Sequence, residues 1–256
     1  MQAVLLAGGL GTRLQPLTSS VPKPMIRVNK RPFLEYELTL LAERGITDVV
    51  LCVGYLGDQV VQHFGSGLGL GMRIQYSWDG EQLLGPIGAL KNAEPFLEEH
   101  FFVLYGDAYL RLDYEALMSA MLASNRLGAM AVLHNCQEYG PSDLLVEDGI
   151  VKDYDKNHVR PELEWVNFGV SALRRQALEL VEPRRFCDEE TFYRQLISQR
   201  QLVAFEVKNR FYEIGSPSGL EQFSRFIEAR LAQVAPPARV PSSPQRHRLP
   251  ISTDMD

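Results

Sequence analysis

The chain has 256 residues, of which 45% are hydrophobic and 23% charged, a composition typical of a globular protein and unlike a small disulfide-stapled scaffold. Its net charge of −6, from 26 basic and 32 acidic side chains, argues against nucleic acid as a partner, because binding to a phosphate backbone needs a basic field. No apolar stretch approaches the ~20 residues that span a bilayer, and the 3 cysteines and 5 histidines lack zinc or disulfide spacing, so we expect a soluble, cytoplasmic protein without a membrane partner.

The first half of the chain alternates short apolar runs with stretches of helical periodicity. Strands are predicted at 2–6, 48–55, 72–77, 101–107 and 129–134, and helices at 32–44, 58–64, 88–93 and 113–124. Strands that alternate with helices need crossover connections. The sequence therefore predicts an α/β fold with a mostly parallel, Rossmann-like sheet that helices cover on both faces.

The second half has a different rhythm, which is typical of a smaller α+β elaboration. It contains a predicted hairpin at 143–154, strands at 165–173, 203–207 and 211–214, and helices at 174–181, 188–199 and 217–231. We expect one domain over 1–232, with halves of about 1–135 and 136–232. The remaining segment, 233–256, holds five prolines and no aromatic residue, so we expect it to be disordered.

A glycine-rich segment directly follows the first strand. Gly8, Gly9 and Gly11 allow a ligand to approach the backbone closely, and successive N–H groups there can cradle a polyphosphate. Arg13 adds a bidentate guanidinium and Lys23 adds a point charge. The segment is suited to bind a phosphate anion.

Two common glycine motifs do not explain this segment. A P-loop needs a lysine and then a serine or threonine directly after its last glycine, and Gly11-Thr12-Arg13 offers no such lysine. A dinucleotide fingerprint needs a third glycine where Leu14 stands, and an acidic residue after the second strand, which ends in Gly54-Tyr55.

The same segment resembles the signature of the sugar-1-phosphate nucleotidyltransferases. That signature is GGxGTRLxPLT followed by PKP, and both parts stand here unbroken at 8–18 and 22–24. The likeness extends from residue 2 to about 230. The stretches PFLEYELTLL, LCVGYLGDQV and MRIQYS are most similar to the heptose-1-phosphate guanylyltransferase branch.

The resemblance implies the nucleotide-diphospho-sugar transferase fold, with a nucleotide-binding first half and a sugar-binding second half. It implies transfer of a nucleotidyl group from a nucleoside triphosphate to a sugar 1-phosphate with release of pyrophosphate, in a monomer or homodimer. GTP with a heptose or hexose 1-phosphate is the first hypothesis. Thymidylyl, uridylyl or cytidylyl specificity, or a catalytically weak regulatory homologue, are the alternatives.

The resemblance also implies roles for residues of the glycine-rich segment. Lys23 would stabilise charge on the α-phosphate, and Arg13 would hold the β- and γ-phosphates. The nucleotide would lie against residues next to the first strand, namely Leu6, Ala7, Gly8, Gly9, Gly11 and Thr12.

Asp107 is the candidate ligand of a Mg²⁺ cofactor. It follows the apolar run FFVLY at the carboxyl end of a predicted strand, where open α/β sheets bind ligands. Hard cations such as Mg²⁺ prefer carboxylate and phosphate oxygens. In the family a second carboxylate lies in a WxDIGTP-like motif, and the matching FYEIGSP stretch places Glu213 in that role.

The resemblance places the sugar end of the site in the second half. Lys156 would contact the sugar phosphate and Asp155 the sugar hydroxyls, while Asn167 and Gly169 match an Asn-x-Gly strand whose amide binds the sugar.

On the base side, the resemblance implies Glu81 and Gly88. There the chain departs from the family's LGTxGAL, because Pro86 and Ile87 replace a threonine and a small residue. This change removes a hydroxyl and an N–H donor and is expected to add bulk beside the nucleotide.

Overall fold

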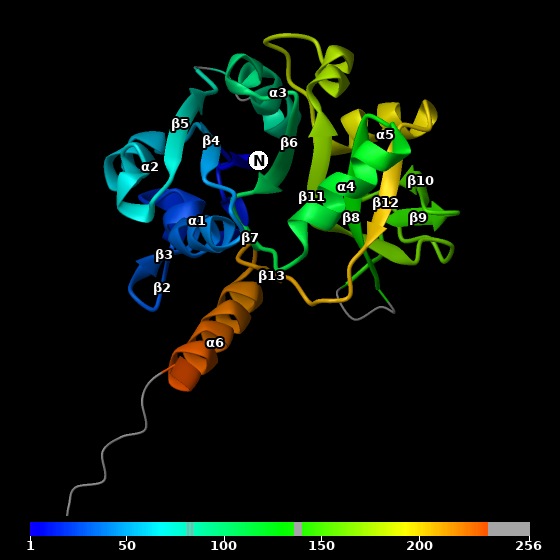
Figure 1. The fold of residues 1–256 in the computed structure, drawn as a ribbon. Coiled ribbons are helices and arrows are strands. Elements are labelled where there is room, and N and C mark those ends of the chain that lie inside the picture. The colour runs from blue at the N-terminus through cyan, green and yellow to red at the C-terminus, as the bar shows by residue number, and fades with distance from the viewer. Residues whose placement is uncertain (81, 83, 136–139, 235–256) are drawn as a thin grey trace, which may run out of the picture.

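The computed structural model describes residues 1–80, 82, 84–135 and 140–234. These residues fold around a mixed nine-stranded sheet with the strand order β5-β4-β1-β6-β11-β8-β12-β10-β9 (Figure 1). Its strands are β1 (Gln2–Leu6), β4 (Asp48–Val53), β5 (Arg73–Trp78), β6 (His100–Tyr105), β8 (Gly128–His134), β9 (Leu144–Glu147), β10 (Ile150–Tyr154), β11 (Trp165–Arg174) and β12 (Leu202–Glu206).

Six α-helices and two small ladders complete the described chain. The helices are α1 (Phe33–Glu43), α2 (Gly57–Phe64), α3 (Gly85–Asn92), α4 (Tyr114–Ser124), α5 (Glu189–Ser198) and α6 (Pro217–Val234). The ladders pair β2 (Arg27–Val28) with β3 (Arg31–Pro32), and β7 (Ala108–Tyr109) with β13 (Tyr212–Glu213). The sequence did not predict β2, β3 or β7, because two-residue strands carry no readable periodicity.

The first four strands of the order form the predicted parallel sheet. β1 pairs in parallel with β4 and β6, and β4 pairs in parallel with β5. Side chains of β1 alternate between two cores, because Ala3 and Leu5 face one side of the sheet and Val4 the other. Such strands read as continuous apolar runs, which is why the sequence located them closely.

The second half joins the same sheet in a way that the sequence did not predict. β11 lies between β6 and β8 and runs antiparallel to both. β8 then pairs in parallel with β12, and β9 and β10 form the predicted antiparallel hairpin at the edge. The sheet is therefore parallel on one side and mixed on the other.

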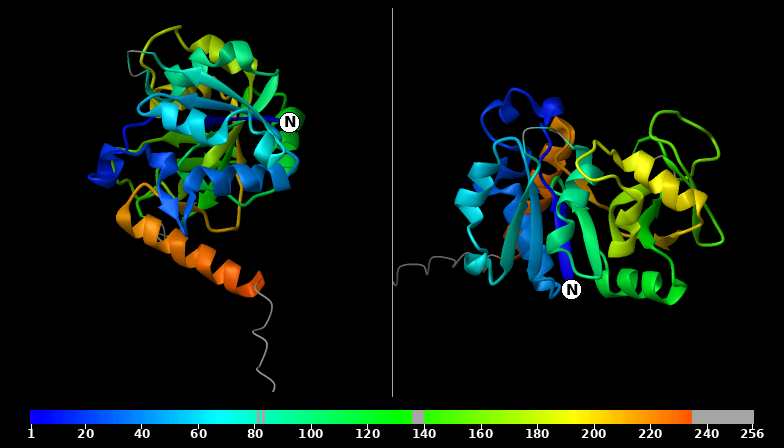
Figure 2. Two further views of the ribbon diagram at one scale, coloured as in Figure 1. Left: turned by 90° about the vertical axis from the view of Figure 1, so that its left-hand side faces the viewer. Right: turned by 90° about the horizontal axis from the view of Figure 1, so that it is seen from above.

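Helices cover both faces of the sheet, as predicted (Figures 1 and 2). On one face α1, α2 and α4 contribute Leu38, Val60 and Leu117 to the core. On the other, α3 and α5 contribute Leu90 and Phe192. The three layers agree with the predicted α/β class.

One predicted helix is a 3-10 helix instead. Residues Arg175–Leu180 form this short element, and no side chain caps its start. In contrast, Asp188 caps α5 by accepting a hydrogen bond of 2.7 Å from the Thr191 N–H. A cap satisfies backbone donors that otherwise limit a short α-helix.

The last helix, α6, begins at Pro217 as predicted and extends away from the sheet (Figure 1). It packs against α1 through an aromatic cluster in which the ring centroids of Phe33 and Phe223 are 4.9 Å apart. The segment 235–256, most of the predicted disordered tail, lies outside the described residues. None of the described helices is both long and apolar enough to cross a bilayer.

Candidate active site

A cleft of about 480 Å³ opens at the carboxyl ends of β1, β4, β5 and β6. This is the edge at which open α/β sheets bind ligands. Nine of the residues singled out in the sequence line it, namely Leu6, Ala7, Gly8, Gly9, Gly11, Thr12, Arg13, Lys23 and Asp107. The other lining residues include Asp79, Gly85, Pro86, Tyr105, Phe186 and Gly215.

The glycine-rich loop keeps its shape through a glycine conformation and one side-chain bond. Gly11 has a φ of 63°, which other residues rarely adopt, and a Cβ there would lie 2.9 Å from Thr18 Cγ2. The Thr18 hydroxyl donates a hydrogen bond of 2.9 Å to the Gly11 carbonyl. The loop is thus closed behind the cleft, and its glycines leave the backbone accessible.

Two cations meet a carboxylate at one end of the cleft. Lys23 forms an ion pair with Asp107, with side chains 13% and 28% exposed. A Cβ on Gly215 would meet the Glu213 carboxylate first, and it would lie 3.1 Å from Arg13 Nη2 and 3.2 Å from Lys23 Nζ. Both cationic groups and the Glu213 carboxylate therefore lie close around the Gly215 backbone.

Glu213 lies beside Asp107 but does not line the cleft. It pairs with Ala108 in the β7–β13 ladder, and the neighbouring Ile214 N–H donates to the Asp107 carbonyl at 2.9 Å. The Glu213 carboxylate accepts hydrogen bonds from the Gly215 N–H and, at 2.7 Å, from the Ser216 hydroxyl. Its oxygens therefore hold the turn before α6.

The base-side residues divide between cleft and core. Pro86 lines the cleft, whereas the Ile87 side chain is fully buried in the core behind it, so the expected bulk beside the nucleotide comes from Pro86 alone. Gly88 does not line the cleft either. It is a packing glycine, since a Cβ there would lie 2.6 Å from the Arg185 carbonyl oxygen. Glu81 lies outside the described residues.

The sequence analysis overlooked Asp79 in the cleft. Asp79 follows β5, and its Oδ2 would lie 3.0 Å from a Cβ on Gly8 and 3.2 Å from one on Gly54. Partial burial raises its pKa to about 6. The rule that identified Asp107, a carboxylate at the end of a parallel strand, applies equally to Asp79 and could have found it.

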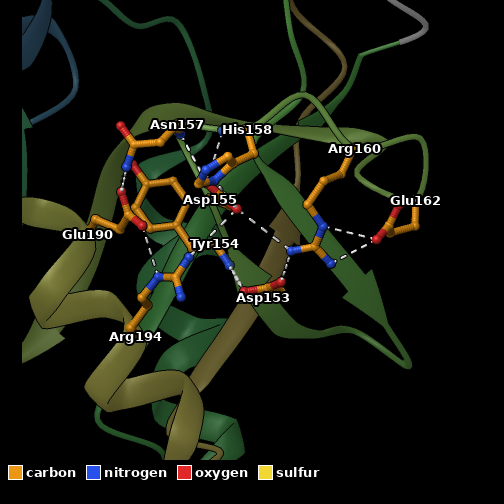
Figure 3. Close-up of polar contacts among 9 residues, drawn as sticks. All are labelled: Asp153, Tyr154, Asp155, Asn157, His158, Arg160, Glu162, Glu190 and Arg194. Atoms are coloured by element: carbon orange, nitrogen blue, oxygen red, sulfur yellow. Dashed lines mark hydrogen bonds and ion pairs between the residues drawn. The ribbon is translucent and has the colours of Figure 1, made fainter.

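Asp155, which the resemblance places on sugar hydroxyls, bonds within its own loop. Its carboxylate accepts hydrogen bonds from the backbone N–H groups of Asn157 and His158, at 3.0 and 3.1 Å. The guanidinium groups of Arg160 and Arg194 approach it to 3.8 and 3.9 Å (Figure 3). The hydrogen bonds from Asn157 and His158, foremost that from Asn157, lower the pKa of Asp155. Asp155 organises its own loop because a short acidic side chain readily bonds to the backbone two or three residues on.

Lys156 and Asn167 meet in a second cluster, apart from the cleft lining. Lys156 forms an ion pair with Glu189, and the Asn167 amide donates a hydrogen bond of 2.6 Å to the same carboxylate. Gly169 has a φ of 94° and donates 2.9 Å to Asn167 Oδ1, at a register shift of β11. Asp143 accepts from the Asn167 N–H at 3.0 Å, and burial raises the pKa of Asp143 to about 6.

Glu189 is the second residue that the sequence analysis overlooked. It opens α5, where an acidic residue is also expected simply to complement the helix dipole, so the sequence held no separate signal.

The sequence model of the nucleotidyl transferase family matches residues 2–144. The D-glycero-alpha-D-manno-heptose 1-phosphate guanylyltransferase of Campylobacter jejuni is 30% identical over 224 residues, covering 87% of this chain and 98% of that protein. The mannose-1-phosphate guanyltransferase of Candida albicans is 30% identical over 225 residues, covering 85% of this chain. The chain spans 62% of the length of that second relative.

Solved structures give the same fold. HddC from Yersinia pseudotuberculosis, complexed with GMP-PN, is similar with a TM-score of 0.74 and 24% identity, covering 88% of this chain and 99% of that one. A putative glucose-1-phosphate thymidylyltransferase from Bacillus anthracis, in complex with a sucrose, has a TM-score of 0.76 at 19% identity, covering 88% and 95%.

Proposed function

The chain belongs to the nucleotidyl transferase family, and we propose that it transfers a nucleotidyl group from a nucleoside triphosphate to a sugar 1-phosphate, releasing pyrophosphate. GTP and a manno-configured hexose or heptose 1-phosphate are the proposed substrates, in keeping with the names of the two relatives. The proposed setting is the cytoplasm, where nucleoside triphosphates are made.

The observation that carries this proposal is that Arg13 and Lys23 lie close together in one cleft. Both cations lie near Gly215 in the cleft that the glycine-rich loop and Asp107 also line. A triphosphate on the loop would place its negative charge between a bidentate guanidinium and an ammonium group.

The reaction needs positioning and charge stabilisation more than proton transfer. The nucleophile is the phosphate oxygen of the sugar phosphate, which is already ionised, so no general base is required. Two anions must still approach each other, and their repulsion falls when cations lie between them. Lys23 would stabilise the charge that develops at the α-phosphate, and Arg13 would hold the departing pyrophosphate.

The carboxylate of Asp107 fits a Mg²⁺ ligand, because it is a hard oxygen donor that faces the cleft where phosphates would bind. A bound Mg²⁺ would neutralise phosphate charge. Glu213 is proposed as a second ligand from the adjacent strand. Its carboxylate would have to leave the Gly215 N–H and the Ser216 hydroxyl to take that role.

Asp79 supports guanine as the base. An ionised carboxylate can accept hydrogen bonds from N1–H and the N2 amino group of guanine together, whereas adenine, uracil and thymine do not present this pair of donors. Asp79 lines the cleft beside Gly8 and Gly54. No described side chain hydrogen-bonds to it, so its oxygens are available.

Pyrophosphate release in the presence of Mg²⁺ tests the proposal. GTP, dTTP, UTP, CTP and ATP are each paired with mannose 1-phosphate, glucose 1-phosphate and a heptose 1-phosphate. We expect release with GTP and a manno-configured sugar, and a rate lower by about 10²–10³ from Lys23→Ala. Xanthosine triphosphate with Asp79→Asn tests the base, because its C2 carbonyl would accept from the new amide. Nucleotide binding without release for any pair would contradict the transferase and favour the regulatory alternative.

A further inference from the structure

Glu189 is a buried carboxylate that joins the two residues assigned to the sugar. Its side chain is 9% exposed. One oxygen pairs with Lys156 and the other accepts 2.6 Å from the Asn167 amide. A carboxylate offers about four acceptor positions. Lys156, Asn167 and the neighbouring Tyr105 hydroxyl account for three of them, so one acceptor position remains.

The surroundings of Glu189 open to solvent and adjoin the nucleotide cleft. Lys156, Glu189 and Thr191 line a surface hollow whose wall includes Pro86, and Pro86 also lines the cleft. The chain just before Glu189 is bonded to the same wall. The Cys187 N–H donates a hydrogen bond of 2.9 Å to the Leu84 carbonyl. The Cys187 carbonyl accepts a hydrogen bond of 3.1 Å from the Ile87 N–H.

Tyr105 connects Glu189 with the cleft. Tyr105 lines the cleft, and its hydroxyl is buried. Burial and then the negative charge of Glu189 raise the pKa of Tyr105, and a side-chain hydrogen bond to Glu189 raises it further. Glu189 therefore lies against a residue that lines the cleft.

We propose that Glu189 binds sugar hydroxyl groups, in the role that the sequence analysis assigned to Asp155. This inference rests on the proposed function and names a specificity-determining residue for it. A hydroxyl of a pyranose 1-phosphate donates to the remaining acceptor position of Glu189, and Tyr105 holds the carboxylate from the cleft side. Lys156 balances the charge of Glu189, so the carboxylate does not repel the phosphate of the same substrate.

Two matched variants separate the roles of the two buried carboxylates. Glu189→Gln and Asp155→Asn change side chains of nearly equal exposure, 9% and 8%. For Glu189→Gln we expect KM for the sugar 1-phosphate to rise by about tenfold or more, the loss expected for a hydrogen bond to a charged group, with KM for the nucleotide unchanged. Asp155→Asn should raise KM for the sugar 1-phosphate by a smaller factor than Glu189→Gln, and it should lower the melting temperature.

Deoxy analogues of mannose 1-phosphate distinguish contact from mere support. If Glu189 binds a given hydroxyl, the substitution has nothing to remove when that hydroxyl is absent. The analogue without that hydroxyl should therefore bind with the same affinity to the wild type and to Glu189→Gln, as a double-mutant cycle requires. Calorimetry of mannose 1-phosphate with the full chain needs no turnover, so it separates this inference from the proposed reaction. Three results would each overturn the assignment. The first is equal affinity of the wild type and Glu189→Gln for mannose 1-phosphate, the second is an equal loss of affinity for every analogue, and the third is a larger loss of affinity in Asp155→Asn.

Discussion

The proposed phosphate end and the proposed sugar end of the site are built in different ways. At the phosphate end, a continuous run from Leu6 to Arg13 follows one strand, and backbone geometry at Gly11 shapes the loop. At the sugar end, side chains from separate elements converge on one carboxylate. Lys156 follows β10, Asn167 lies on β11 and Glu189 opens α5.

This difference matters for function and for inference. A backbone loop presents N–H groups whatever the sugar, so the phosphate end suits the chemistry that all members of the family share. A side-chain cluster can change one residue at a time, so the sugar end suits substrate selection. We therefore expect phosphate-end variants to lower kcat and sugar-end variants to raise one KM.

The largest effect is expected at Lys23. Removal of one preorganised cation from a developing charge costs about 10²–10³ in rate, so Lys23→Ala should lower kcat by that factor while KM for the sugar 1-phosphate changes little. Steady-state pyrophosphate release measures both. Lys208→Ala, at an exposed lysine, is the control. A kcat close to that of the wild type would refute the division of labour between the two ends.

A smaller, pH-dependent effect is expected at Asp79. Its raised pKa is about 6, so the carboxylate loses its charge as the pH falls through 6 and can no longer accept from both guanine donors. Below pH 6, KM for GTP should rise by about tenfold per pH unit. Phosphate groups titrate in the same range in every variant, so the measurement is the difference in slope between the wild type and Asp79→Asn. Equal slopes would remove Asp79 from base recognition.

The geometry of the phosphate loop should appear in stability. Gly11→Ala places a side chain at positive φ and against Thr18, so we expect a loss of about 1–3 kcal/mol in the free energy of unfolding. Gly9→Ala is the matched control, because a Cβ at Gly9 meets nothing within 4 Å. Thermal melts of the two variants provide the test, and equal melting temperatures would show that Gly11 conformation does not hold the loop.

The smallest effect concerns a contrast between two buried glutamates. Both oxygens of Glu189 have partners, whereas neither oxygen of Glu37, which is 1% exposed on α1, has a hydrogen-bond partner among the described residues. Burial, and after it the charge of Asp107, raise the pKa of Glu37 well above its ordinary value. Folding then favours the protonated carboxyl group of Glu37. The stability associated with this group is fully present below the pKa that it has in the unfolded chain, and it is lost as the pH rises above that value.

Glu37→Met should therefore stabilise the protein at pH 8, by about 1–3 kcal/mol, and by less at pH 5. Denaturant unfolding at the two pH values measures the difference. A gain of the same size at both would show that the pKa of Glu37 does not govern this part of the core.

Local patterns predicted most elements but few of their long-range partners. Apolar runs and caps located β1, β4, β6, α4 and α5 within a few residues. The position of β11 between β6 and β8 was not readable, since strand neighbours are chosen by packing across the whole sheet. Ile87 is a second example. It directly follows Pro86, which lines the cleft, but its own side chain is buried in the core behind the cleft.

By itself, the sequence determined the composition of the glycine-rich loop and its two cations, because one motif carries all of them, and these residues line one cleft. Neighbouring residues need no tertiary contact to be recognised as a unit. Only the tertiary structure decided the surroundings of the proposed sugar end, where Asp155 bonds to its own loop and Glu189 meets Lys156 and Asn167. The direction of a side chain depends on the donors that folding places around it, and those donors come from distant parts of the chain.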